Sequence, residues 1–252
     1  MKYFFDTEFL EGTQSKRFLG FNYGNTKETI DLISIGIVSE DNREYYALSK
    51  DFNLKEAWNR YDLKKVNDGK NEVKVYWIRK NVLKPIFIEL WEKSKDAKLT
   101  DADFHSGIFN YSHFKKLINE YGKSKKQIEF EILQFTLDPA DNGFTEWLGS
   151  SDEYFEALKH IENEKLEFYS YYGAYDWVVF SWIFGKMISL PKSYPMYTKD
   201  LKQIIDEKAG LLRTSLDEIK HRADYPSHEN EHNALDDAKW NLRLFYFINS
   251  LK

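Results

Sequence analysis

The sequence predicts an α/β protein in which a mixed sheet is flanked by helices. Three short segments rich in apolar, β-branched and aromatic residues come first, at 3–9, 30–38 and 43–49. Further along the chain, segments with the apolar spacing of helices surround one more strand, at 166–171. Successive strands, followed by helices that alternate with a later strand, are typical of this fold class.

The helices are placed by apolar residues that recur every three or four positions. The last helix is the clearest, because such residues recur from Leu242 to Leu251. Ser150 and Glu153 have the spacing of a capping box, which predicts a helix start. The expected helices cover residues 75–93, 111–121, 150–161, 175–184, 198–208 and 233–250, with a partly extended segment at 128–136.

The length and composition of the chain indicate one domain. A chain of 252 residues is long enough to bury a sizeable core. Hydrophobic residues make up 42% of it and aromatic residues 17%, which supports a packed core despite a charged content of 31%. We therefore expect a single domain over 1–252, with a long insertion at about 89–149.

Composition also excludes several classes of protein. No apolar run reaches the roughly 18 residues of a membrane-spanning helix, and two acids interrupt the apolar N-terminal stretch, so we expect neither a membrane segment nor a signal peptide. The absence of cysteine excludes disulfides and cysteine-based zinc sites and fits a cytoplasmic protein. A net charge of −5 argues against tight, sequence-independent binding of a duplex, although residues 55–84 carry nine Lys and Arg against four Asp and Glu.

The first strand carries two carboxylates. Asp6 and Glu8 are two residues apart, so their side chains leave the same face of a strand, and aromatic neighbours such as Phe4 and Phe9 indicate burial. Two buried like charges are costly unless a positive charge lies between them. A divalent cation is the usual partner, because hard cations prefer carboxylate oxygen. The pair therefore predicts a metal site on a core strand, and the simpler alternative is a strand end with two solvated acids.

A histidine and two further acids stand at the starts of predicted helices. His232 precedes Asp237 by five residues, a spacing that turns them about 140° apart on a helix. They can converge only if the helix begins near Asn233 and His232 lies on the loop before it. Asp176 follows the strand at 166–171, at the carboxyl end where open α/β sheets usually bind ligands. The simpler alternative for each acid, and our preference for Asp236, is attraction to the positive end of a helix.

Together these residues resemble the motifs of the DEDDh 3′-to-5′ exonucleases of the ribonuclease H-like superfamily. Asp6 and Glu8 match the first motif, Asp176 the second, and His232 with Asp237 the third. The order of the motifs and their strand or helix context agree with the family.

The resemblance extends to ribonuclease AS, the polyadenylate-specific branch of these enzymes. The segments similar to that branch include 3–9, 30–38, 43–47 and 173–176, and the likeness covers about half of the chain. The chain departs from the branch in an extension between Glu11 and Thr29 and in the insertion at about 89–149.

The resemblance implies a five-stranded ribonuclease H-like sheet and a nuclease that uses two Mg²⁺ or Mn²⁺ ions. Asp6, Glu8, Asp176 and Asp237 would hold the ions, and His232 would act as general base. The expected substrate is single-stranded RNA, degraded from its 3′ end to nucleoside 5′-monophosphates, with adenylate tracts as a candidate preference. Single-stranded DNA is the alternative substrate, and the resemblance suggests a homodimer.

Three residues near the motifs are expected to contact the substrate: Thr7, Phe9 and Tyr175. Unpaired bases are commonly held by stacking on aromatic side chains, which favours Phe9 and Tyr175. Either ring could equally belong to the core. No single residue in the sequence indicates how the ribose 2′-hydroxyl would be read.

Two other interpretations compete with the nuclease. His228 and His232 match the H-E-x-x-H signature of zinc hydrolases. That chemistry requires both histidines on one helix face and a third ligand, whereas this segment is rich in Asn and charge and leaves the other acids unexplained. A non-catalytic nucleic-acid-binding module on the same fold is the second alternative, but all five catalytic positions hold suitable residues.

Overall fold

The computed structural model describes residues 1–252 except 20, 67–70, 96–97, 138–164, 229 and 252, and except the side chains of 17 and 18. The chain forms two compact units, each assembled from separate stretches of sequence. The first comprises Met1–Thr7, Ser34–Ala47 and Lys123–Lys252, and the second comprises Glu8–Ile33 and Leu48–Gly122.

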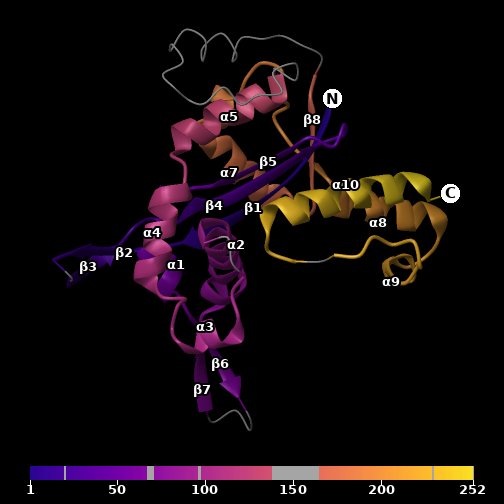
Figure 1. The fold of residues 1–252 in the computed structure, drawn as a ribbon. Helices are drawn as coiled ribbons and strands as arrows, with labels where there is room; N and C mark the ends of the chain where they lie inside the picture. The colour runs from indigo at the N-terminus through magenta and orange to yellow at the C-terminus, as the bar shows by residue number, and fades with distance from the viewer. Residues whose placement is uncertain (20, 67–70, 96–97, 138–164, 229, 252) are drawn as a thin grey trace. The chain divides into compact units, whose positions relative to one another are not determined.

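The main sheet is mixed and five-stranded, with strand order β5-β4-β1-β8-β9 (Figure 1). Strand β1 pairs in parallel with β8, with Tyr3 opposite Phe168, and β8 pairs in parallel with β9. The strands of this sheet are β1 (Lys2–Gly12), β4 (Thr29–Ser39), β5 (Glu44–Leu48), β8 (Glu167–Ser170) and β9 (Lys199–Asp200).

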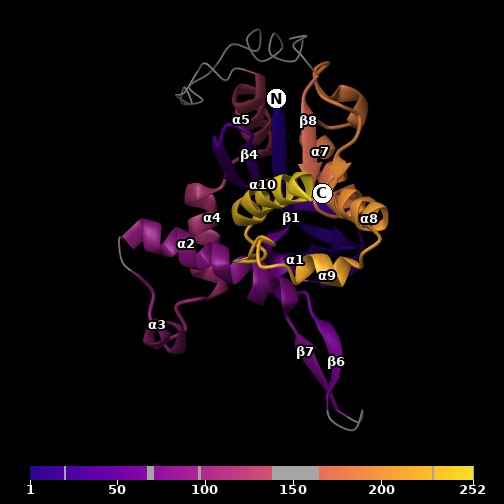
Figure 2. The same ribbon diagram turned by 90° about the vertical axis from the view of Figure 1, so that its right-hand side faces the viewer.

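Helices of the first unit pack in two groups. The contacts pair α8 with α10 and α5 with α7, and α8 and α10 lie side by side in both ribbon views (Figures 1 and 2). Among the described residues, its helical elements are α5 (Lys125–Leu137), α7 (Ala174–Ile183), the 3₁₀ turn η2 (Met187–Ser189), α8 (Leu201–Leu212), α9 (Leu216–Lys220) and α10 (Ala234–Ser250).

Side-chain alternation along β1 places its aromatic residues on both faces of the sheet. The ring of Phe4 lies 5.1 Å from that of Phe245 in α10 and shares a core with Leu201 of α8. On the opposite face, the ring of Phe5 lies 5.4 Å from that of Phe180 in α7. Strand β1 is therefore covered on both sides, which accounts for its nearly continuous aromatic run.

The second unit has a core of its own, to which Leu10, Ile33, Phe87 and Phe114 contribute. Two antiparallel hairpins, β2–β3 and β6–β7, extend away from its helices (Figure 1). Its elements are β2 (Ser15–Phe18), β3 (Phe21–Asn25), α1 (Leu54–Asn59), β6 (Asp62–Val66), β7 (Asn71–Val75), the π-helical turn η1 (Arg79–Leu83), α2 (Lys84–Lys95), α3 (Asp101–His105) and α4 (Tyr111–Tyr121).

The predicted fold class is confirmed, and one element is corrected. Residues 128–136, expected to be partly extended, lie within helix α5. All residues from Phe130 to Leu137 are buried, polar ones included, so the sequence lacks the one-sided apolar stripe that marks a surface helix. The sequence also missed both hairpins and the short helices α1, α3 and α9. The helix expected at 150–161 lies outside the described residues.

Within the described part of the chain, no helix combines the length and the apolar character needed to cross a membrane.

Candidate functional site

Strand β1 directs its polar residues to two different helices. Positions 4, 6 and 8 share one face of the strand, and positions 5 and 7 share the other. Because Phe4 packs toward α10 and Phe5 toward α7, Asp6 leaves the strand on the α10 side and Thr7 on the α7 side. One strand therefore presents polar groups to the first turns of both helices.

Three carboxylates form a compact cluster on the α10 side. One oxygen from each of Asp6, Glu8 and Asp237 lies within 4.8 Å of the others, and Glu8 and Asp237 are buried. Asp6 and Asp237 belong to the first unit, and Glu8 follows on the same continuous strand, so the strand itself fixes Glu8 beside Asp6. Clustered, buried carboxylates repel one another unless a cation lies between them. This all-oxygen donor set fits a hard divalent cation such as Mg²⁺ or Mn²⁺.

Asp176 is anchored to the backbone of β1 on the α7 side. The backbone N–H and the hydroxyl of Thr7 both donate to Oδ1 of Asp176, at 3.0 and 2.6 Å. The side chain of Asp176 is buried, and this burial raises its pKa to about 6, although the two hydrogen bonds from Thr7 oppose the rise. Asp176 lies outside the cluster of three, but its partner Thr7 stands between Asp6 and Glu8 in the strand.

Asp237 is held in the first turn of α10 by the loop that precedes it. The N-cap Asn233 accepts hydrogen bonds from the backbone N–H groups of the first turn, which fixes the helix start immediately after His232. The backbone N–H of His232 donates to Oδ2 of Asp237 at 3.0 Å. His232 and Asn230 adopt positive φ angles of 70° and 54°, an uncommon backbone conformation for residues other than glycine. His232 thus lies on the loop before the helix, the position that its spacing from Asp237 requires.

The sequence did not predict the role of His228 at this carboxylate. Nε2 of His228 makes a short hydrogen bond to Oδ1 of Asp237, so both oxygens of Asp237 are engaged by the loop. The imidazole stacks on Trp240, with ring centroids 4.4 Å apart and planes inclined by 11°. The stacking of His228 on Trp240 arises only in the folded chain, and the sequence signal, a second histidine four residues before His232, pointed to a different motif.

The H-E-x-x-H segment does not have the helical setting that its zinc chemistry requires. His228, Glu231 and His232 lie in turns and irregular structure ahead of Ala234, where α10 begins. His228 directs its ring to Asp237 and Trp240, and the backbone N–H of His232 donates to Asp237. The zinc signature aligns its two histidines, four residues apart, on one face of a helix.

A cleft adjoins Glu8 within the second unit. Its volume is about 650 Å³, and its lining includes Glu8, Phe9, Arg60 and Trp77. Trp77 is 41% exposed, so the cleft offers aromatic surface next to a carboxylate of the cluster. Phe9 was expected near the substrate; Trp77 was not, because nothing in the local sequence distinguishes it from a core tryptophan.

The two other residues expected to contact substrate have contrasting settings. Tyr175 lies in the first turn of α7 next to buried Asp176 and is 54% exposed. Thr7 is buried and donates both of its hydrogen bonds to Asp176. Thr7 therefore positions a carboxylate, and its contact with substrate stays a prediction, as do those of Phe9 and Tyr175.

The donor groups of the carboxylate cluster suit phosphate chemistry. A cluster of carboxylates suits a divalent cation, two histidines flank one of those carboxylates, and a cleft with aromatic lining begins at another. Cations held by carboxylates commonly neutralise phosphate oxygens during hydrolysis.

Comparison with known proteins agrees with this direction. No protein-family model matches the chain. Its sequence is similar to two 3′-5′ exoribonucleases of Mycobacterium tuberculosis, from strains CDC 1551 and H37Rv. To each, the chain is 26% identical over 253 aligned positions, which cover 99% of this chain and 94% of the relative.

Proposed function

We propose that this protein is a metal-dependent 3′-5′ exoribonuclease of the DEDDh type, with a ribonuclease H-like fold. The observation that carries the proposal is the cluster of Asp6, Glu8 and Asp237, whose oxygens lie within 4.8 Å of one another. Similarity along almost the whole chain to two 3′-5′ exoribonucleases supports the same reaction. The DEDDh motif matches extend this support to Asp176 and His232.

The proposed division of roles follows from the resemblance to the DEDDh motifs, and the clustering of the carboxylates supports it. Asp6, Glu8 and Asp237 would hold Mg²⁺ or Mn²⁺, and Asp176, fixed by Thr7, would complete a site for two ions. When bound, such ions activate water and neutralise charge on the phosphate. His232, on the loop before α10, is the proposed general base, because an imidazole nitrogen can accept a proton from water. His228 orients Asp237 through its hydrogen bond to Oδ1.

The proposed substrate is single-stranded RNA, shortened from its 3′ end to nucleoside 5′-monophosphates. Adenylate preference and a homodimer are further expectations from the resemblance to ribonuclease AS, and the absence of cysteine fits a cytoplasmic enzyme. Single-stranded DNA is the alternative substrate, and the same assay distinguishes it.

The test is a time course with 5′-labelled poly(A), poly(U), mixed-sequence RNA and matching DNA, each with Mg²⁺, Mn²⁺ or Zn²⁺. We expect a ladder that shortens from the 3′ end with Mg²⁺ or Mn²⁺ and disappears in Asp6→Ala and His232→Ala. Asp236→Ala is the matched control, since Asp236 is an acid of the same helix turn outside the cluster.

The substrate ratios decide the finer assignments. An RNA-to-DNA ratio well above one supports the exoribonuclease, and the A-to-U ratio measures base preference. If every substrate stays intact with every metal, the proposal is refuted. If Zn²⁺ alone restores activity, the zinc hydrolase is favoured.

A further inference from the structure

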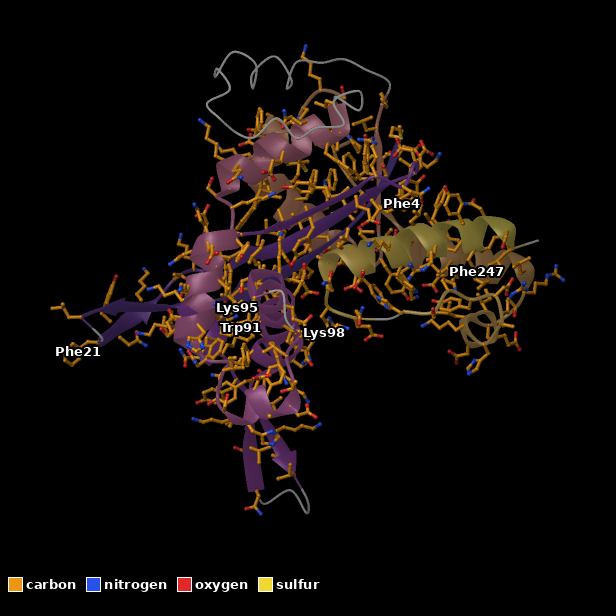
Figure 3. The ribbon with its side chains drawn as sticks, in the orientation of Figure 1. Phe4, Phe21, Trp91, Lys95, Lys98 and Phe247 are labelled. Carbon is orange, nitrogen blue, oxygen red and sulfur yellow. The ribbon has the colours of Figure 1, made fainter. Side chains whose placement is uncertain are left out.

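The β2–β3 hairpin carries large apolar side chains that are exposed to solvent. Leu19, Phe21 and Tyr23 are 82%, 78% and 68% exposed. Figure 3 shows Phe21 at the outer end of the hairpin. Scattered exposed apolar residues are ordinary, but three of them within five positions of one projecting hairpin mark a contact surface.

The same hairpin is positively charged in an acidic protein. Residues 13–27 contain Lys16, Arg17 and Lys27 and no Asp or Glu, whereas the whole chain has a net charge of −5. The side chain of Lys27 is exposed beside the second strand of the hairpin. We call residues 13–27 the basic ribbon.

Hydrogen bonds hold the base of the basic ribbon in place. The backbone N–H of Gln14 donates to Oγ1 of Thr26 at 2.9 Å, and the N–H of Thr26 donates to the carbonyl of Gln14 at 2.8 Å. The N–H of Ser15 donates to the Glu56 carboxylate of α1 at 3.3 Å. A ribbon fixed at its base presents its side chains with little loss of entropy on binding.

A β-bulge determines how the aromatic residues are presented. Lys16 pairs with Gly24 and Arg17 with Asn22, so Tyr23 is an extra residue on β3. Such bulges bend a strand and redirect its side chains, and they are common next to functional sites. The bulge therefore places Tyr23 out of the regular alternation that Phe21 follows.

The basic ribbon continues directly from the strand that carries the carboxylates. Strand β1 contains Glu8 and ends at Gly12, and β2 begins at Ser15. Gly12 also lines the cleft that contains Phe9 and Trp77. Within the second unit, the lining of the cleft beside Glu8 is therefore within a few residues, along the chain, of the base of the ribbon.

We propose that the basic ribbon binds single-stranded RNA upstream of the 3′ end that enters the site. This inference rests on the proposed exoribonuclease function and adds a second contact surface to it. Exposed aromatic rings interleaved with cations are the features that hold unpaired bases and their phosphates. A protein partner fits less well, because lysine is depleted in the centres of protein–protein interfaces. Phe21 and Tyr23 stack on bases, and Lys16 and Lys27 contact phosphates.

The first test measures RNA affinity without cleavage. Fluorescence anisotropy with a chelator present would compare the wild type with the double variant Phe21→Ala/Tyr23→Ala on single-stranded RNAs of about 5 and about 20 nucleotides. We expect the Kd for the longer RNA to rise about 10- to 100-fold, since each stacked base contributes substantially to binding. The Kd for the shorter RNA should not change. Tyr246→Ala, which removes an aromatic ring of α10 that is 54% exposed, is the matched control.

The second test measures the charge contribution. In Lys16→Ala and Lys27→Ala, the slope of log Kd against log salt should fall by about 0.7 each, as expected for one phosphate contact on a single strand. Lys220→Ala, an exposed lysine in α9, should leave the slope unchanged.

The outcomes distinguish failure of the ribbon proposal from failure of the proposed exoribonuclease function. Equal affinity of the double variant and the wild type for the longer RNA overturns the inference, and so does a wild type that binds no RNA. If the double variant instead changes the molar mass measured by light scattering while its RNA affinity is kept, the ribbon is a protein interface. Ribbon-dependent binding without any shortening of RNA would support the ribbon and refute the nuclease.

Discussion

The substitution Gly36→Ala tests whether the start of α10 must lie directly on the sheet. A Cβ atom at Gly36 of β4 would lie 2.3 Å from the carbonyl oxygen of Ala234 and 2.4 Å from Cα of Leu235. Ordinary contacts begin near 3.4 Å, so the backbone must move by about 1 Å to admit a methyl group. Gly36→Ala therefore displaces the first turn of α10, which carries Asp237.

We expect Gly36→Ala to lower both stability and activity, and activity more. Overpacking of this kind costs about 1–3 kcal/mol, which corresponds to a fall in Tm of about 2–12 °C for a protein of this size. A displacement of about 1 Å in a catalytic group can reduce the rate about 100-fold. The assays are thermal unfolding and kcat/KM on single-stranded RNA.

Gly210→Ala is the matched control. Gly210 lies within α8, and a Cβ atom there meets nothing within 4 Å. Alanine should stabilise the helix by about 0.5–1 kcal/mol and leave kcat/KM unchanged. A Gly36→Ala protein with wild-type Tm and wild-type kcat/KM would refute the close approach of α10 to β4.

Three further predictions concern the acids of the site. Asp176→Asn should stabilise the metal-free protein at neutral pH. The pKa of Asp176 is about 6 in the folded protein, above the usual 3.8. The unfolding free energy of the wild type therefore falls by about 3 kcal/mol as pH rises between these values. Chemical unfolding in the presence of a chelator should show that Asp176→Asn is more stable than the wild type at pH 7 and no longer so below about pH 4. A stability difference that does not vary with pH would contradict this prediction. Thr7→Val removes the hydroxyl donor to Asp176 and should lower the unfolding free energy by about 1–3 kcal/mol. Thr7→Ser keeps a hydroxyl and should largely retain the wild-type value. A Thr7→Val protein with the unfolding free energy of the wild type would count against the contact. Mg²⁺ or Mn²⁺ should raise the Tm of the wild type by mass action and have little effect on Asp6→Ala, whereas equal shifts in both proteins would place the ion elsewhere.

Much of the architecture is set by patterns that act over a few residues. The aromatic run of β1 requires a strand covered on both faces, and the two-residue spacing of Asp6 and Glu8 puts both carboxylates on one face. Asn233 and the apolar spacing after it determine where α10 begins, and hence that His232 precedes it. These features were predictable because strand alternation and helix capping depend only on neighbours in sequence.

Other features depend on burial that the local sequence does not encode. Helix α5 is buried almost all round, so its apolar residues show no single stripe, and an extended segment was expected instead. All five side chains of β3 are exposed, so this strand has no buried apolar face, and the segment was seen in the sequence only as an extension.

By itself, the sequence determined the fold class, the strand that carries Asp6 and Glu8, and the helix start that carries Asp237. Only the tertiary structure decided the partners of these residues. Thr7 and Asp176 are 169 positions apart, and nothing local requires Oδ1 of Asp176 to accept both hydrogen bonds of Thr7. The ring of His228 reaches Asp237 because Trp240 supports it. Such contacts arise when whole elements pack together, and packing depends on the shape of every side chain in the core.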